Sequence, residues 1–301
     1  MLAPFPHSAI INVPATVSGA LLEAAEDLPL YDAKDFYSFA LQSLVADTVR
    51  GKCTDAFDWL VDRINKGIAR RPYCVLIRGL RFDRGNRLFI ALNRAFGKMV
   101  ALPYQEPRAQ LVHHLQPRTD ILSARGGREA ERLHTDAADW GTPIRFISMV
   151  CVRPDPDGQG RSRLLDVDAV QEEVQTKLGR DSLELLKQPM PWQLHECWGG
   201  GLKWRPVLTE STVCWRRYTI LLAVDVEGAE VSREMLGLLD EFEKVVEDSD
   251  HRIDFLMQEG ELLFSDNSRG LHARTPIMDA DDSRRLMIRS WIDTGDIVVM
   301  P

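Results

Sequence analysis

The chain has 301 residues, an apolar fraction of 45%, a charged fraction of 27% and a formal net charge of −8. These values are typical of a folded protein with ample material for a core. They argue against a nucleic-acid-binding protein, which normally carries a basic stripe. The five cysteines are widely spaced and contain no Cys-x-x-Cys pair, so they fit neither a disulfide framework nor a zinc ribbon.

Neither a signal peptide nor a membrane-spanning segment is expected. Prolines interrupt the short apolar stretch at the N-terminus, which also has no basic region. No segment approaches the roughly 20 apolar residues that a membrane span needs. The expected location is the cytoplasm.

Helical spacing of apolar residues dominates the first hundred residues. The predicted helices there cover residues 35–49, 55–69 and 87–99. Asp32 or Asp35 would serve as the N-cap of the first of them. The apolar, β-rich run 73–77 interrupts this pattern and predicts a buried strand.

Beyond residue 100 the pattern changes to short strands separated by turns. The predicted strands cover residues 110–115, 144–152, 218–226, 261–265 and 285–293. Helices are expected at 168–178 and 232–246, a polar loop at 117–132, and loop with short strand at 192–208. The fold class predicted is mainly β with flanking helices, as a sandwich or barrel. We expect residues 1–301 to form one domain, in which a helical region (1–70) packs on a core (71–301).

The sharpest local feature is the His-x-Asp pair His134 and Asp136. On a strand, positions i and i+2 point to the same face, so the imidazole and the carboxylate would project together into one cavity. Such a pair is a common accident when it stands alone. Its neighbourhood, a Gly-containing polar loop before it and an apolar strand after it, favours a functional interpretation.

A second feature lies far downstream, in residues 260–276. An apolar strand leads into a tight polar turn and then reaches a single histidine, His272. Arg285 and Arg289 follow inside an otherwise apolar strand, where an unpaired charge is costly. Because the two arginines share strand parity, both would face the same side. A solvated face is the alternative interpretation of this pattern.

Two histidines and one carboxylate on one face of a metal leave three coordination positions open, which is the arrangement of non-haem iron(II) oxygenases. The open positions can take a bidentate cosubstrate and dioxygen. An arginine nearby can bind the far carboxylate of a dicarboxylic acid through two parallel hydrogen bonds.

Taken together, these motifs resemble the taurine dioxygenase and clavaminate synthase branch of the iron(II)/2-oxoglutarate oxygenases. His134-Thr135-Asp136 matches the family's His-x-Asp/Glu, and residues 260–276 are similar to its second-histidine signature. Arg285 and Arg289 match its two arginines in spacing. Ser162 stands where the family usually has a threonine, and Gln159 where it usually has a glycine. The resemblance spans roughly residues 70–295.

The resemblance implies a double-stranded β-helix, or distorted jelly roll. It implies Fe(II), 2-oxoglutarate and O2 as cofactor and cosubstrates, with His134, Asp136 and His272 as metal ligands. Arg285, Ser162 and Arg289 would bind 2-oxoglutarate, which is oxidatively decarboxylated to succinate and CO2 while a C–H bond of the substrate is oxidised. Halogenating relatives lack the carboxylate, so Asp136 argues against that activity.

The substrate implied is a small polar molecule, most often an amino acid or a derivative, free or bound to a carrier protein. Trp140 is predicted to line the substrate cavity, and Arg125 and Arg128 to contact the substrate from the loop 117–132. His113 and His114 are adjacent on a predicted strand, so one would be packed and the other exposed. The oligomeric state does not follow from the sequence.

Two other functions remain open on the residues alone. A zinc hydrolase could use the same three ligands, but it needs a general base and gives Arg285 no role. A jelly-roll binding protein without catalysis would keep the shape, although loss of catalysis usually removes a metal ligand.

Overall fold

The computed structural model describes residues 4–100, 111–117, 130–141, 144–196, 199–277 and 285–295. Thirteen strands and eight α-helices lie within these ranges. The architecture is therefore mixed α/β, and helices contribute more than the mainly β prediction implies. Among the described residues no helix is long and apolar enough to cross a membrane.

The larger sheet joins strands from distant parts of the chain in the order β1-β2-β11-β6-β13-β3, with β4 also paired to β13. Its strands are β1 (Ile10–Asn12), β2 (Cys74–Arg78), β3 (Lys98–Val100), β4 (His113–Leu115), β6 (Phe146–Arg153), β11 (Leu262–Asp266) and β13 (Leu286–Asp293). All pairs are antiparallel except β1 with β2. The late strand β13 is thus inserted between β6 and the early strands β3 and β4.

The smaller sheet has the order β10-β7-β12-β5. Its strands are β5 (Glu131–His134), β7 (Ser162–Asp166), β10 (Ile253–Phe255) and β12 (Gly270–Arg274). In the antiparallel pairing of β5 with β12, His134 lies directly opposite His272. A separate antiparallel hairpin is formed by β8 (Met190–Gln193) and β9 (Leu202–Arg205).

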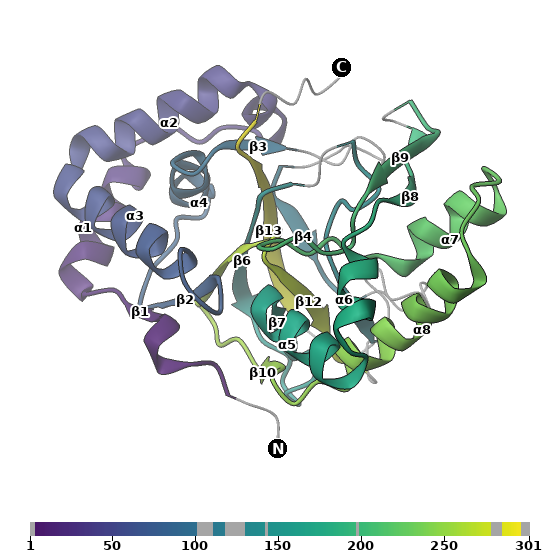
Figure 1. Ribbon diagram of the computed structural model, residues 1–301. Coiled ribbons are helices and arrows are strands. Elements are labelled where there is room, and N and C mark those ends of the chain that lie inside the picture. The colour runs from purple at the N-terminus through teal and green to yellow at the C-terminus, as the bar shows by residue number, and fades with distance from the viewer. Residues whose placement is uncertain are drawn as a thin grey trace.

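The helices form two outer layers, one on each sheet, as Figure 1 shows. The first group comprises α1 (Ala15–Glu26), α2 (Phe39–Lys52), α3 (Thr54–Ile68) and α4 (Arg87–Arg94), with the 3-10 helices η1 (His7–Ala9) and η2 (Ala33–Tyr37). The second comprises α5 (Val167–Lys177), α6 (Arg180–Leu186), α7 (Arg217–Asp225) and α8 (Arg233–Glu247). The first group shares an apolar cluster with Val75 and Ile77 of the larger sheet, and the second with Leu133 and Leu271 of the smaller one.

Strand alternation then decides which side chains face the space between the sheets. Cys74 and Leu76 alternate with Val75 and Ile77, and they pack against Leu164 of the opposite sheet. The same alternation on β12 turns Leu271 and Ala273 toward the helices. His272 and Arg274 therefore face the interior.

The predicted strand 218–226 is wrong, because this segment is the helix α7. Its buried positions Ile220 and Ala223 are three residues apart, while Tyr218 and Val226 are exposed. This is the spacing of a helix packed on one side. A short apolar run cannot be assigned from periodicity alone when both outcomes bury the same residues.

Two predicted helix boundaries are also corrected. The helix expected to reach residue 99 ends at Arg94, and the chain continues into β3. Gly97, at φ 158°, lies so close to β13 that an added Cβ would stand 2.2 Å from the Asp293 carbonyl oxygen. The helix expected from Asp35 begins at Phe39, where the Ser38 hydroxyl accepts the Leu41 N–H. Asp35 belongs to the preceding 3-10 turn, in which its carboxylate accepts the Asp32 N–H.

Two helix glycines, one packed between α3 and β2 and the other exposed in α8, are predicted to respond in opposite directions to replacement by alanine. A Cβ on Gly67 would stand 2.1 Å from the Cγ1 atom of Val75, whereas a Cβ on Gly237, exposed in α8, meets nothing within 4 Å. We expect Gly67→Ala to lower the free energy of unfolding by about 1–3 kcal/mol through overpacking. Gly237→Ala should raise it by up to about 1 kcal/mol, because alanine favours the helix. Denaturant titration measures both, and a stabilised Gly67→Ala variant would contradict this packing.

Candidate metal centre and active site

Three potential metal ligands meet on the inner face of the smaller sheet. His134 ends β5, His272 lies in the middle of β12, and Asp136 follows two residues after His134. The Nε2 atom of His134 is 3.3 Å from Asp136 Oδ1, and that of His272 is 3.5 Å from Asp136 Oδ2. One ligand atom from each residue lies within 4.8 Å of the others.

The orientation of His134 is set by its own strand. Its Nδ1 atom is 2.8 Å from the carbonyl oxygen of Arg132. Because a carbonyl only accepts, Nδ1 carries the proton and Nε2 keeps its lone pair toward the cluster. A histidine held in this way is typical of metal ligands in proteins.

Asp136 is buried yet held ionised. Burial by itself opposes ionisation of the carboxyl group. The charge of Arg289 is the largest effect opposing burial, and together with the neighbouring His272 it holds the pKa of Asp136 well below its usual value. Burial lowers the pKa of His272, against the opposing effect of Asp136. An ionised carboxylate beside a neutral imidazole is a donor set that fits a divalent transition metal such as Fe(II).

The backbone that carries Asp136 is clamped by a side chain from the turn after β11. The amide oxygen of Asn267 accepts the Asp136 N–H at 3.0 Å. Its amide nitrogen donates to the carbonyl oxygens of Asp136 at 3.1 Å and Ile144 at 2.9 Å. All of these groups are buried, so the clamp also satisfies polar atoms that would otherwise destabilise the site.

Two further contacts fix the chain on either side of Asp136. The Thr135 hydroxyl accepts the Trp215 N–H at 3.0 Å, and the Thr135 N–H donates to the Trp215 carbonyl at 2.8 Å. Ala137 has φ 55°, a left-handed conformation that L-residues rarely adopt. The guanidinium of Arg205 in β9 then donates to the carbonyl oxygens of Ala138 and Trp140. The segment after Asp136 is therefore held by the β8–β9 hairpin.

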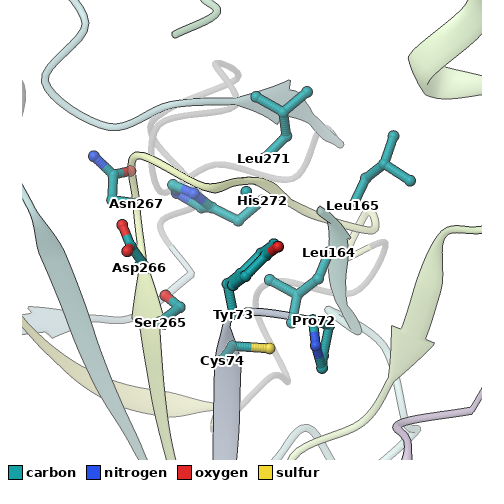
Figure 2. Close-up of a pocket in the computed structure, with 11 residues that line it drawn as sticks. Pro72, Tyr73, Cys74, Leu164, Leu165, Ser265, Asp266, Asn267, Leu271 and His272 are labelled. Carbon is teal, nitrogen blue, oxygen red and sulfur yellow. The ribbon is translucent and has the colours of Figure 1, made fainter. Parts of the chain in front are cut away.

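A small pocket opens beside His272, between strands of the two sheets, as Figure 2 shows. His272 lies between the polar turn that carries Asp266 and Asn267 and the apolar side chains from β2 and β7. The lining residues are Pro72, Tyr73, Cys74, Leu164, Leu165, Ser265, Asp266, Asn267, Gly270, Leu271 and His272.

Arg285 is buried next to a second guanidinium, that of Arg274. Burial, followed by the like charge of Arg274, lowers the pKa of Arg285 to about 10. Gly160 lies against Arg285, since an added Cβ would be 3.0 Å from its Nε atom. On β12 Arg274 pairs with Ser162 of β7, so Ser162 shares the inner face with these cations. The predicted cosubstrate residues Arg285 and Ser162 therefore lie in one buried basic region.

Of the other predicted site residues, Arg289 contacts the metal cluster, Trp140 packs in the interior, and two lie outside the described residues. The Arg289 guanidinium donates to Asp136 Oδ2 at 3.0 Å. Both Arg285 and Arg289 are largely buried, which removes the solvated-face interpretation. Trp140 is buried and meets the Trp291 ring edge-on at 5.4 Å. Arg125 and Arg128 lie outside the described residues.

Several residues of the site were not found from the sequence. Asn267 and Arg205 act through backbone groups, and no spacing rule identifies such contacts. Glu131 lies at the start of β5, and its Oε1 atom is 3.4 Å from His134 Nε2. A register shift between His272 and Arg274 sets Glu131 opposite Arg274, which simple alternation from His134 does not predict.

His113 is buried while His114 is exposed, as predicted, and burial lowers the pKa of His113 to about 4.

Comparison with known proteins agrees with this geometry. A sequence profile described as "Taurine catabolism dioxygenase TauD, TfdA family" matches residues 208–291, which include His272, Arg285 and Arg289. No curated protein sequence matches the chain.

Several solved structures share the fold. An asparagine oxygenase in complex with Fe(II), 2S,3S-3-hydroxyasparagine and succinate aligns with a TM-score of 0.73 at 14% identity, over 95% of this chain and 93% of that one. The non-heme iron oxygenase OrfP in complex with Fe and alpha-ketoglutaric acid aligns with a TM-score of 0.73 at 18% identity, over 96% and 94%. OrfP with Fe, succinate and (3R,4R)-dihydroxy-L-Arg gives 0.72 at 17%, over 96% and 95%.

The cluster of the His-x-Asp pair and the distal histidine therefore lies in a fold that the chain shares with these oxygenases. In sequence, residues 208–291 are similar to the TauD/TfdA family of dioxygenases.

The Asn267 clamp gives a prediction for metal affinity. Asn267→Ala leaves three buried backbone groups without their partner, and we expect a loss of about 1–3 kcal/mol in the free energy of unfolding. Because Asp136 is then less well oriented, the affinity for Fe(II) or Mn(II) should fall about 10- to 100-fold. Anaerobic calorimetry measures the affinity, and Asn267→Asp, which keeps the acceptor, should lie between the two proteins. Unchanged affinity in Asn267→Ala would contradict the clamp.

Proposed function

We propose that this protein is an iron(II)- and 2-oxoglutarate-dependent dioxygenase that hydroxylates a C–H bond of an amino acid or an amino-acid-derived metabolite. The observation that carries the proposal is the buried cluster of His134, Asp136 and His272 beside the basic region of Arg285. The amino-acid substrate class is supported by the hydroxylated asparagine and arginine bound in the related structures. The proposed substrate is a small molecule that is either free or attached to a carrier protein.

In this proposal His134, Asp136 and His272 hold Fe(II) and leave three positions for 2-oxoglutarate and dioxygen. The bound iron supplies the oxidative decarboxylation of 2-oxoglutarate, coupled to oxidation of the substrate C–H bond. Arg285 binds the far carboxylate of the cosubstrate through paired hydrogen bonds, and Ser162 donates a further one. Arg289 is also proposed to bind 2-oxoglutarate, and its contact with Asp136 places its guanidinium at the metal end of the site. The buried side chains around the cluster exclude water.

We also propose a fold type and a domain organisation for the chain, and three residues that contact the substrate. The two facing sheets form the distorted jelly roll of the family, and the N-terminal helices belong to the same domain. The support for this is the cluster in which residues of α1–α4 pack directly on the larger sheet. Trp140, Arg125 and Arg128 as substrate contacts, and a cytoplasmic location, remain predictions.

Turnover of 2-oxoglutarate tests the function. With Fe(II), 2-oxoglutarate and O2, we expect succinate formation that increases when the right member of an amino-acid panel is added. His134→Ala and His272→Ala should each reduce it to the rate of the metal-free protein, because each removes an imidazole ligand and leaves only one histidine and Asp136 to hold the metal. His114→Ala, an exposed histidine on β4, is the matched control and should keep the full rate. Full turnover in both ligand variants would refute the assignment.

A further inference from the structure

The carboxylate of Asp136 receives two hydrogen bonds on the same oxygen, and both come from β13. The indole Nε1–H of Trp291 donates to Asp136 Oδ2 at 2.9 Å. The guanidinium of Arg289 donates to the same atom at 3.0 Å. Trp291 and Arg289 are two residues apart on a strand, which explains why both reach one atom from one direction.

The two donors differ in what they can contribute. The Arg289 guanidinium supplies charge, but it is a long side chain with several rotatable bonds. The indole of Trp291 is neutral at every physiological pH and rigid. Its ring is buried, meets Trp140 edge-on at 5.4 Å, and lies 5.5 Å from the His113 ring. The direction of the indole N–H is therefore fixed by packing before any metal binds.

This geometry separates the two oxygens of Asp136. Oδ2 accepts both hydrogen bonds from β13 and lies 3.5 Å from His272 Nε2, whereas Oδ1 accepts neither of them and lies 3.3 Å from His134 Nε2. Rotation of the carboxylate about its Cβ–Cγ bond would break both hydrogen bonds to Oδ2. A buried tryptophan usually finds a partner for its N–H, as Trp192 does with the Arg205 carbonyl oxygen at 3.0 Å. Trp291 differs because its acceptor is a charged group of the metal cluster.

We propose that Trp291 is a positioning residue of the metal centre: its indole N–H holds Asp136 Oδ2, so that the carboxylate binds the metal through Oδ1 alone. Single-oxygen ligation keeps the other coordination positions open for the cosubstrate and dioxygen. The inference rests on the proposed function only for the assignment of Asp136 as a ligand. It adds a donor outside the ligand set, of the kind that tunes ligand direction in other metal sites.

Metal binding rather than turnover tests this. Trp291→Phe keeps the buried ring and removes only the N–H donor. With anaerobic Co(II) as the probe, we expect affinity to fall about 10- to 100-fold. The visible Co(II) spectrum should also change, because a carboxylate free to bind through both oxygens alters the coordination number. Trp59→Phe is the control, since it removes an indole N–H from α3 in the outer helical layer, and it should leave affinity and spectrum unchanged.

A merely structural role of Trp291 would give a different result. Trp291→Phe would then lose thermal stability without metal but bind Co(II) with the wild-type affinity and spectrum, which would overturn the inference. If Trp291→Phe does not fold, the indole N–H signals of the wild-type protein give the answer by NMR. The Trp291 signal should move on addition of one equivalent of Zn(II), while that of Trp59 in α3 stays; an unmoved Trp291 signal would overturn the inference. Altered Co(II) binding in a protein without 2-oxoglutarate turnover would support the inference while refuting the proposed function.

Discussion

A buried carboxylate must keep its charge for this site to exist. Asp136 is almost inaccessible to solvent, and burial alone would favour its protonated form. It remains ionised because Arg289 and the two histidines surround it and because Trp291 donates to one of its oxygens. Removal of any one of these partners leaves a buried charge less well compensated, which is costly in a protein interior.

Much of the fold can be understood as the means of bringing these partners together. β5 and β12 supply the two histidines from the smaller sheet, and β13 supplies Arg289 and Trp291 from the larger one. The turn after β11 adds the Asn267 clamp, and the β8–β9 hairpin holds the chain that follows Asp136. Residues separated by more than 150 positions thus converge on one carboxylate.

The basic region next to the cluster has its own electrostatic constraint. Arg285 is buried, Arg274 is half-buried, and the like charge of Arg274 adds to burial in lowering the pKa of Arg285. Two neighbouring guanidiniums in a low-dielectric interior are stabilised by an anion between or beside them. The dicarboxylate cosubstrate that we propose, with one end at the metal and the other at Arg285, would meet this requirement.

The sequence predicted the cluster of potential metal ligands better than it predicted the architecture. His134, Asp136 and His272 were predicted because strand alternation and a distal histidine after a polar turn are visible in the chain, and the structure brings them together. The helix α7 was predicted as a strand, since a short apolar run fits either state until its packing partner, the β8–β9 hairpin, is known.

Contacts that depend on tertiary structure had no signal in the sequence. Asn267 binds backbone groups, and the Trp291 indole meets Asp136 from 155 positions away. The position of Glu131 depends on a register shift between β5 and β12. Such contacts follow from packing and not from residue spacing.

The most direct test of the account is anaerobic addition of Fe(II) and 2-oxoglutarate to the metal-free protein, followed by visible absorption. The account predicts the weak charge-transfer band of 2-oxoglutarate chelated to Fe(II). In Arg285→Ala the band should appear only at much higher 2-oxoglutarate, because the far carboxylate has lost its paired hydrogen bonds. Arg132→Ala, whose exposed side chain pairs with Glu243, should bind like the wild-type protein. Iron bound normally without any band would contradict the assignment of the cosubstrate and of the site as an oxygenase centre.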